Sequence, residues 1–280
     1  MKILVTGGTG FLGTAIVKSL RKKNNKVYSL SRSDGKHTDD ISCNLEDFSD
    51  IDRISKTLSS QNIDVVIHLA SALVKKESDQ YEVFEKNLKI SEGLIRLVKS
   101  ISPLKLINAS STAVYPEITG TFDEKSQIEP AFNSDALYGL SKFVSENLIY
   151  FNLKHTDIAC IQLRIGQIYG DKMPEERIIP VLRKELLECS KITLFGSGER
   201  IIPLANIYFL VDVIEKFIKS KLESGVFNVV SENKSLIDIA KSIAEEEGIL
   251  DPNIVLISNG KKSKFRISTK KLERFLQDIS

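Results

Sequence analysis

Several features that would point to particular classes of protein are scarce in this sequence. Its 280 residues include only three cysteines and three histidines. Cys43, Cys160 and Cys189 are scattered along the chain and form no C-x-x-C spacing, which argues against disulfides and against a zinc knuckle. The histidines lie far apart with no ligand spacing, so no metal site is expected.

The sequence also has almost no net charge and no long hydrophobic run. Its 39 basic and 37 acidic residues leave a formal charge of +2. So small a charge creates no strong field for nucleic acid or an anionic membrane, and neither is an expected partner. No apolar run is long enough to span a bilayer, and no charged segment with a cleavage site precedes the first apolar residues. We therefore expect a cytoplasmic protein.

What is present is ordinary globular composition, with 42% hydrophobic and 27% charged residues. A chain of this length can bury a sizeable core. It suits one large α/β domain, or a nucleotide-binding domain that carries a smaller lobe.

A glycine-rich turn lies near the start of the chain, between an apolar segment and an amphipathic one. Residues 2–6 are predicted to form a buried strand, and a helix is predicted to begin at Phe11. Such a turn allows a close approach of backbone to a pyrophosphate, and the start of the helix offers free N–H groups. We expect dinucleotide binding here, the alternative being an ordinary strand-turn-helix. The glycines that fit G-x-G-x-x-G or G-x-x-G-x-x-G are Gly7, Gly8, Gly10 and Gly13.

The end of the second predicted strand, residues 27–30, bears on the choice of cofactor. An acid at this point accepts the ribose hydroxyls of NAD, whereas an arginine favours the 2′-phosphate of NADP. The chain continues with Ser31, Arg32 and Ser33, and no acid occurs before Asp34. Arg32 therefore favours NADP(H) over NAD(H), unless it is simply a solvated arginine in a polar loop.

Predicted strands and helices alternate through the first 165 residues. This alternation favours a Rossmann-type doubly wound parallel sheet in an α/β fold. Further strands are predicted at 65–69, 104–109 and 157–164, a short extended piece at 41–47, and helices at 50–59, 79–99 and 137–153. A long loop, residues 116–135, follows the 104–109 strand at its carboxyl end, where an open α/β sheet binds its ligand.

Beyond residue 165 the alternation is less regular. Helices are predicted at 177–189, 207–221, 236–246 and 269–277, and strands at 192–194, 226–230 and 254–257. We expect residues 1–165, with about 205–230, to form the dinucleotide-binding domain. We expect about 166–204 and 231–280 to form a small C-terminal substrate-binding lobe.

Tyr138 and Lys142 are the strongest candidates for chemistry. Residues at i and i+4 lie one above the other on one helix face. A nearby ammonium favours the phenolate, which would bring a tyrosine closer to proton transfer at neutral pH. The alternative is a half-buried tyrosine beside a solvated lysine.

Taken together, these motifs resemble the extended short-chain dehydrogenase/reductase family. The similarity is to its branch of nucleotide-sugar epimerases, dehydratases and 4-ketoreductases, closely over residues 1–170 and weakly beyond. The segments that carry it are TGGTGFLG at 6–13, HLA at 68–70, Asn87, SSTAVY at 110–115, YGLSK at 138–142 and LRIGQIYG at 163–170.

The resemblance implies roles for individual residues. Tyr138 would be the general acid/base, Lys142 would lower the pKa of Tyr138 and bind the nicotinamide ribose, and Ser111 would hold the reacting oxygen. Thr112 is the fallback for Ser111 and a substrate contact. His68 would be structural, and Asn87 would lie near the cofactor or the sheet scaffold. The implied cofactor-binding residues are Gly7, Gly10, Phe11, Leu12, Gly13, Arg32, Asn44, Leu45, Leu69, Ala70, Asn87, Tyr138 and Lys142.

The chain departs from these relatives in the substrate region. Gln167 stands where the family has an asparagine that meets the substrate. Arg200, in FGSGER, is the candidate for a sugar-nucleotide phosphate, and Arg266 is a second one. Thr112 and Ala113 replace the Asp-Glu pair that the dehydratase branch needs, which disfavours dehydration.

The resemblance therefore implies an NAD(P)H-dependent oxidoreductase that reduces the keto group of a 4-keto-deoxysugar nucleotide. One alternative is a nucleotide-sugar 4-epimerase that retains its cofactor. An alternative of another class is a non-catalytic dinucleotide sensor, although a sensor has no need of the proton-transfer residues. The family also implies a homodimer.

Overall fold

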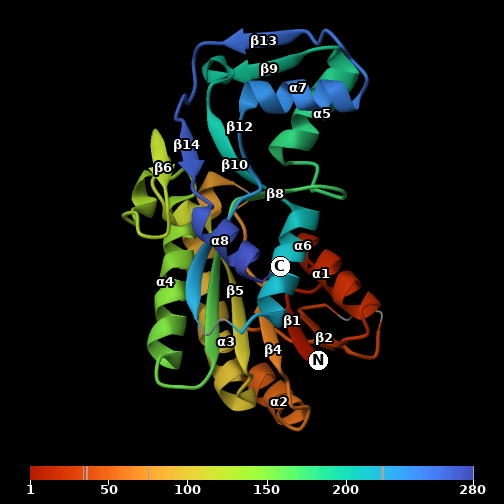
Figure 1. The fold of residues 1–280 in the computed structure, drawn as a ribbon, viewed down its shortest axis with the longest axis vertical. Coiled ribbons are helices and arrows are strands. Elements are labelled where there is room, and N and C mark those ends of the chain that lie inside the picture. Colours follow the sequence, from red (N-terminus) through yellow and green to blue (C-terminus); the bar gives the residue numbers. More distant parts are fainter. Residues whose placement is uncertain (34, 36, 75, 222–223, 280) are drawn as a thin grey trace.

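The computed structural model describes residues 1–33, 35, 37–74, 76–221 and 224–279. Its largest element is a sheet of seven parallel strands in the order β11-β7-β5-β4-β1-β2-β3, seen in the lower half of Figure 1. The strands are β1 (Lys2–Thr6), β2 (Lys26–Ser31), β3 (Asp40–Ser42), β4 (Val65–His68), β5 (Lys105–Ser111), β7 (Ala159–Ile165) and β11 (Gly225–Val229).

Helices cover both faces of this sheet. Successive residues of a strand point to opposite faces, so Ile3 and Val5 join one hydrophobic cluster and Leu4 joins the other. The helices α1 (Phe11–Lys22), α6 (Ile207–Lys219) and α8 (Lys270–Asp278) contribute to the first cluster, and α2 (Phe48–Ser59), α3 (Gln80–Ile101) and α4 (Ala136–Leu153) to the second. The predicted doubly wound Rossmann fold is confirmed.

A smaller lobe with its own hydrophobic cluster lies at one end of the molecule, at the top of Figure 1. It contains the helices α5 (Ile178–Cys189) and α7 (Leu236–Glu246), the pair β9 (Ile192–Phe195) and β13 (Ile254–Ile257), and the sheet of β8 (Gln167–Tyr169), β10 (Ile201–Asn206) and β12 (Glu232–Ser235). A further pair, β6 (Gly120–Phe122) with β14 (Phe265–Ile267), ties the long loop to the C-terminal segment.

Five short strands were not predicted: β6, β8, β10, β12 and β14. They carry weak patterns, because β10 contains Pro203 and β12 is the polar segment ENKS. The extended piece predicted at 41–47 is shorter than expected. Only Asp40–Ser42 is strand, and the Asp47 side chain caps α2 by accepting from the Ser49 backbone N–H at 2.9 Å.

The C-terminal helix α8 packs differently from the domain division expected from the sequence, which grouped it with the small lobe. Leu272 is buried in the cluster of the large domain. The ring of Phe275 stacks on that of Phe217, with centroids 4.3 Å apart. The helix therefore covers the large sheet beside α6 and β11.

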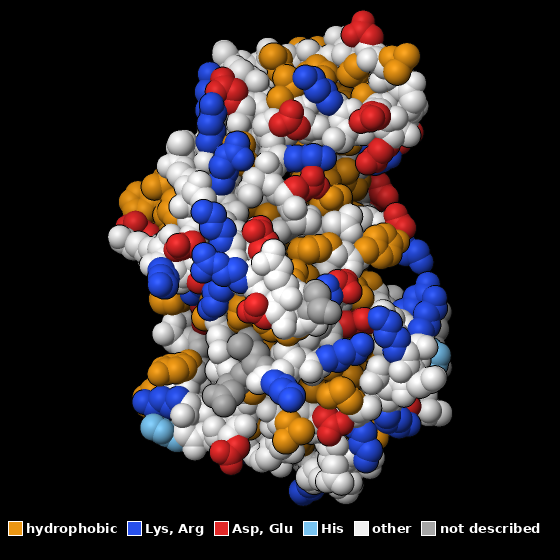
Figure 2. Space-filling model, viewed as in Figure 1, with side chains coloured by type: hydrophobic (Ala, Val, Ile, Leu, Met, Phe, Trp, Pro, Cys, Tyr) orange, Lys and Arg blue, Asp and Glu red, His pale blue; other side chains and the backbone are white. Residues whose placement is uncertain are grey.

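The surface carries both signs of charge. Figure 2 shows Lys and Arg side chains interspersed with Asp and Glu over the face it presents. Every helix within the described ranges is too short or too polar to cross a membrane.

Lys105 ties the start of β5 to the end of α6. Its buried Nζ donates to the carbonyl oxygens of Phe217 at 2.8 Å and Ser220 at 2.7 Å.

We predict that Lys105→Met lowers the free energy of unfolding by about 1–3 kcal/mol, because the helix end loses its charged donor. Urea unfolding followed by circular dichroism measures this. Lys18→Met, on the exposed face of α1, is the control and should change stability by less than about 0.5 kcal/mol; equal midpoints for the two variants would contradict the prediction.

Candidate functional site

A cavity of about 700 Å³ opens at the carboxyl ends of the central strands. It begins at the β1–α1 turn, passes the ends of β2, β4 and β5, and reaches the small lobe. The sequence-predicted residues that line it are Gly7, Gly10, Phe11, Leu12, Gly13, Arg32, Asn44, Leu45, Leu69, Ala70, Ser111, Thr112, Tyr138, Lys142, Gln167 and Arg200.

The glycine turn has the geometry that dinucleotide binding requires. Gly7 has a φ of +72°, which favours glycine, and a Cβ on Gly13 would lie 2.1 Å from the Gly7 carbonyl oxygen. Gly10 is the N-cap of α1 and provides no side-chain cap, and the first turn holds no acid. The N–H groups at this helix start, beside the cavity, therefore suit a pyrophosphate.

The opposite wall of this end comes from β2 and the segment after β3. Arg32 is exposed directly after β2, and Asn44 and Leu45 line the cavity beside it, because β2 and β3 are paired. The Asn44 side-chain oxygen accepts from the Glu46 N–H at 3.2 Å, which fixes this segment. Asp34 lies outside the described residues.

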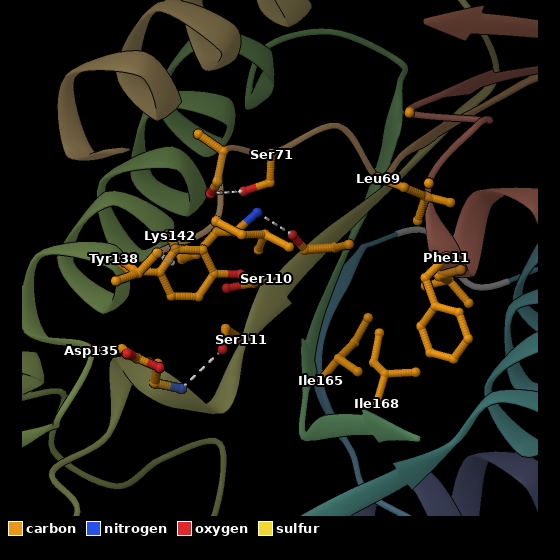
Figure 3. Close-up of a pocket in the computed structure, with 18 of the residues that line it drawn as sticks. Phe11, Leu69, Ser71, Ser110, Ser111, Asp135, Tyr138, Lys142, Ile165 and Ile168 are labelled. Carbon is orange, nitrogen blue, oxygen red and sulfur yellow. Dashed lines mark hydrogen bonds between the residues drawn. The ribbon is translucent and has the colours of Figure 1, made fainter. Parts of the chain in front are cut away.

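The proton-transfer candidates meet at the far end of the cavity. Figure 3 shows Tyr138 and Lys142 from α4 facing Ser110 and Ser111 from β5. Lys142 Nζ lies 5.7 Å from the centroid of the Tyr138 ring and donates to the Ala109 carbonyl at 3.1 Å. Ser111 Oγ accepts from the Ala113 N–H at 3.1 Å, which fixes the serine loop.

Gly139 explains how α4 comes so close to the serine loop. A Cβ at this position would lie 2.1 Å from the Ala113 carbonyl oxygen. Only glycine allows this contact without displacing the loop. The residue that follows Tyr138 therefore determines how near the phenol lies to Ser111.

Burial shifts the pKa values of both Tyr138 and Lys142. Burial and, after it, the Asp135 carboxylate together raise the pKa of Tyr138 to about 12, against the opposing hydrogen bonds of Ser71 and Ser111. Burial also lowers the pKa of Lys142 to about 8, although the charge of Glu146 acts in the opposite direction. The net shift of the Tyr138 pKa is therefore upward, and a lowering of this pKa by Lys142 stays a prediction. The phenol is protonated throughout the neutral range.

Asn87 and His68 do not line the cavity but make hydrogen bonds to the segments around it. Asn87 accepts from the Ala72 N–H at 2.8 Å and donates to Ser141 Oγ at 3.0 Å, so it belongs to the scaffold. His68 is buried, with Nδ1 2.7 Å from Thr6 Oγ1, and burial lowers its pKa to about 3. A neutral histidine fits the structural role expected of it.

The substrate candidates separate in space. Gln167 and Arg200 line the cavity, whereas Arg266 is exposed on β14 and is not among the lining residues, so its phosphate contact stays a prediction. Arg200 Nη2 lies 2.5 Å from Glu117 Oε1, and Lys261 Nζ lies 3.0 Å from Oε2 of the same carboxylate. The Nε of Arg200 is buried and has no hydrogen-bond partner among the described residues.

Sequence reasoning missed several polar residues of the cavity, and four of them are Ser71, Glu117, Asp135 and Arg177. Ser71 follows the HLA motif directly, and that position at the end of β4 could have identified it. The other three lie in irregular segments with no spacing to mark them. No group of three or more potential metal ligands occurs within the part of the chain that the structure describes.

A comparison with protein-family models identifies the class. The model of the NAD dependent epimerase/dehydratase family matches residues 3–229. The chain belongs to this family. The family expected from the sequence motifs is confirmed.

Individual relatives are distant. The chain is 28% identical to the dTDP-D-glucose 4,6-dehydratase of Dictyostelium discoideum over 86% of its own length and 61% of that protein. It is 26% identical to the dTDP-4-dehydro-6-deoxyglucose reductase of Escherichia coli over 82% of its length and 76% of that protein. The chain thus spans about three fifths of the Dictyostelium protein.

A solved structure with the same fold is that of a dTDP-glucose 4,6-dehydratase from Bacillus anthracis in complex with NAD. The TM-score is 0.81 at 20% identity, over 99% of this chain and 90% of that one. This likeness confirms the fold, including the small lobe.

We predict that Gly13→Ala weakens NADH binding at least tenfold, which corresponds to about 1.4 kcal/mol. The added methyl group would meet the Gly7 carbonyl and push the turn away from the helix. Titration by nucleotide fluorescence measures the affinity, and circular dichroism verifies folding. Thr14→Ala, at the exposed next position of α1, is the control. Equal affinities in the two folded variants would show that the turn does not carry the cofactor.

Proposed function

We propose that this enzyme reduces the 4-keto group of a nucleotide-activated deoxysugar. The observation that carries the proposal is the convergence of Ser111, Tyr138 and Lys142 on one cavity that also contains the glycine turn. A dinucleotide held at the turn and a sugar held under the small lobe would meet at these three side chains.

The proton-transfer step uses the protonated phenol of Tyr138 and the cation of Lys142. A nicotinamide cofactor held at the glycine turn would supply hydride for the carbonyl carbon of the sugar. Tyr138, as a phenol with a pKa raised to about 12, gives its proton to the carbonyl oxygen. Ser111 donates a hydrogen bond to the same oxygen, and the Lys142 cation stabilises the phenolate that remains.

Substrate phosphates would bind through Arg200. Its guanidinium lines the cavity, and one edge is held by Glu117, while the buried Nε has no partner among the described residues. A planar guanidinium with free donors suits a diphosphate. Gln167 on β8 would contact the sugar next to it.

Two observations favour reduction over the other reactions of the family. Thr112 and Ala113 follow Ser111, where the resemblance requires an Asp-Glu pair for dehydration. One relative is named a reductase of a 4-keto-deoxysugar nucleotide. A 4-epimerase would use the same residues and retain its cofactor, and a non-catalytic sensor would keep the turn without needing Tyr138.

We predict that Tyr138→Phe lowers kcat for NAD(P)H oxidation with a 4-keto-deoxysugar nucleotide by about 10²-fold or more, because the proton donor is lost. Binding of the dinucleotide should be retained, since the ring remains. Stopped-flow absorbance at 340 nm measures the rate. Tyr208→Phe, at an exposed tyrosine on α6 outside this cavity, is the control.

The same assay separates the alternatives. Net consumption of NAD(P)H supports the reductase. Interconversion of sugars without consumption would identify an epimerase, and an unchanged rate in Tyr138→Phe would remove that residue from the mechanism.

We further propose that NADP(H) is preferred over NAD(H), on the basis of Arg32 alone. This arginine lines the cavity, and β2 ends on Ser31 rather than on an acid. The solved relative from Bacillus anthracis holds NAD.

We predict that Arg32→Ala lowers kcat/KM for NADPH about tenfold or more and leaves that for NADH within about twofold, since one charge-assisted contact to the 2′-phosphate is lost. Arg53→Ala, on α2 and outside the cavity, serves as the matched control. Equal losses with both nucleotides in Arg32→Ala would contradict the preference.

The family resemblance also motivates proposals of a homodimer and a cytoplasmic location. Tyr81 on α3 and Tyr150 and Phe151 on α4 are large and exposed. An interface built from α3 and α4 of both copies would bury these rings. Sedimentation of the purified protein tests the dimer.

A further inference from the structure

A row of polar side chains crosses three strands beneath the proton-transfer residues. In the register of the sheet, Ser110 on β5 lies beside Arg164 on β7, and Arg164 lies beside Asn228 on β11. All three are at most 5% exposed. They lie on the sheet face that α4 covers, since their neighbours in sequence, such as Leu163 and Ile165, belong to the opposite cluster.

The centre of this row is a buried ion pair with α4. Arg164 Nε and Nη2 donate to the two carboxylate oxygens of Glu146 at 3.1 and 2.8 Å. The third nitrogen, Nη1, donates to the Tyr115 hydroxyl at 2.8 Å, which in turn donates to Asn228 Oδ1 at 2.9 Å. The Ser110 hydroxyl donates to Glu146 Oε1. Both charges are thus fully paired.

Glu146 shares its helix face with the catalytic candidates. Tyr138, Lys142 and Glu146 are spaced at i, i+4 and i+8, so they lie in one line along α4. Ser110, the hydroxyl that Glu146 holds, directly precedes Ser111. The carboxylate therefore connects the helix that carries the phenol to the strand that carries the serine.

We propose that Glu146, oriented by Arg164, is a positioning residue that ties α4 to the end of β5, so that the Tyr138 phenol and the Ser111 hydroxyl reach the same substrate oxygen and Lys142 keeps its positive charge. The proposal deepens the proposed function and rests on it. Glu146 touches neither substrate nor cofactor in this account.

The energetics of buried charge support a role beyond stability. Removing two ions from water is costly, and a buried pair is often no more stabilising than apolar residues of the same size. What such a pair provides is a fixed geometry: a bidentate contact restricts the rotation and the sliding of α4 against the sheet. Because Tyr138 and Glu146 belong to the same helix, fixing Glu146 also restricts the position of the Tyr138 phenol.

Glu146 is also the nearby negative charge that favours the Lys142 cation. Burial lowers the pKa of Lys142 to about 8, and Glu146 acts against that shift. Three groups near this amine are neutral at that pH: the Ala109 carbonyl, the Tyr138 phenol, and His68 on β4, whose pKa burial lowers to about 3. The Arg164 guanidinium, which is bound to Glu146, is positive. Loss of the carboxylate charge would therefore lower the pKa of Lys142 further.

The experiment compares Glu146→Gln, Glu146→Asp and Tyr115→Phe with the wild type. Reductive kcat should fall above pH ~8 in the wild type, as Lys142 loses its proton. In Glu146→Gln we expect kcat at pH 7 to fall at least tenfold and KM for NAD(P)H to stay within about twofold. The fall of kcat at high pH, the alkaline limb of the pH profile, should move to lower pH. Glu146→Asp should restore the position of the limb.

Tyr115→Phe is the matched control, because it removes a buried hydrogen bond of Arg164 on the side away from Glu146. Tyr115→Phe should lower the melting temperature of the protein and leave the alkaline limb of the kcat profile at the wild-type pH. The proposal would be overturned if Glu146→Gln folds and keeps both the kcat and the alkaline limb of the wild type. It would also be overturned if Tyr115→Phe moves the alkaline limb as far as Glu146→Gln does. Should Glu146→Gln fail to fold, Ser110→Ala keeps the ion pair and should lower kcat with unchanged KM for NAD(P)H; an unchanged kcat in Ser110→Ala would then overturn it.

A second readout separates this proposal from the proposed function. Absence of NAD(P)H oxidation by the wild type with every 4-keto-sugar nucleotide tested would refute the function. The titration of the Lys142 amine by NMR needs no turnover, and it should move to lower pH in Glu146→Gln. An unmoved titration would refute the effect of Glu146 on Lys142 whatever the substrate is.

Discussion

Parallel pairing of the central strands is the constraint on which the site depends. In a parallel sheet all carboxyl ends lie at one edge, so the glycine turn after β1, Ser71 after β4 and Ser111 at the end of β5 meet there although they are far apart in sequence. Helix α4 then has to bring Tyr138 and Lys142 to the same edge. It can do so because Gly139 allows its backbone to touch the serine loop. Chemistry at this edge follows from the topology.

Burial determines what the assembled groups can do. The same desolvation that raises the pKa of Tyr138 lowers that of Lys142, so the phenol keeps its proton while the amine lies near the point of losing one. A protonated phenol beside a lysine cation is suited to giving a proton to a developing oxyanion. The network around Glu146 holds these groups in the interior, where the Glu146 carboxylate and the Arg164 guanidinium pair with each other. Charge pairing and desolvation therefore act on the same few residues.

Most of the fold and one part of the site were predictable, because they follow from local rules. Glycines at 7, 10 and 13 and the i, i+4 spacing of Tyr138 and Lys142 are visible in the sequence. Strands such as β12 were not, since their pairing depends on distant partners rather than on an apolar pattern. The positions of the Asn87 and Arg266 side chains relative to the cavity could not be predicted either, because they depend on packing between distant segments. The rise of the Tyr138 pKa by burial could not be predicted from the sequence, because the depth of burial is a property of the assembled structure.

The central claim is that one cavity brings a nicotinamide at the glycine turn to a sugar carbonyl at Tyr138. Deuterium transfer tests it most directly. The enzyme is given NAD(P)H labelled with deuterium at the reactive nicotinamide carbon, together with a 4-keto-deoxysugar nucleotide in ordinary water, and the product is analysed by mass spectrometry and NMR. The account predicts one deuterium on C4 of the reduced sugar. A reduced sugar whose C4 hydrogen comes from water, or sugar turnover that leaves all the label on the nucleotide, would contradict it.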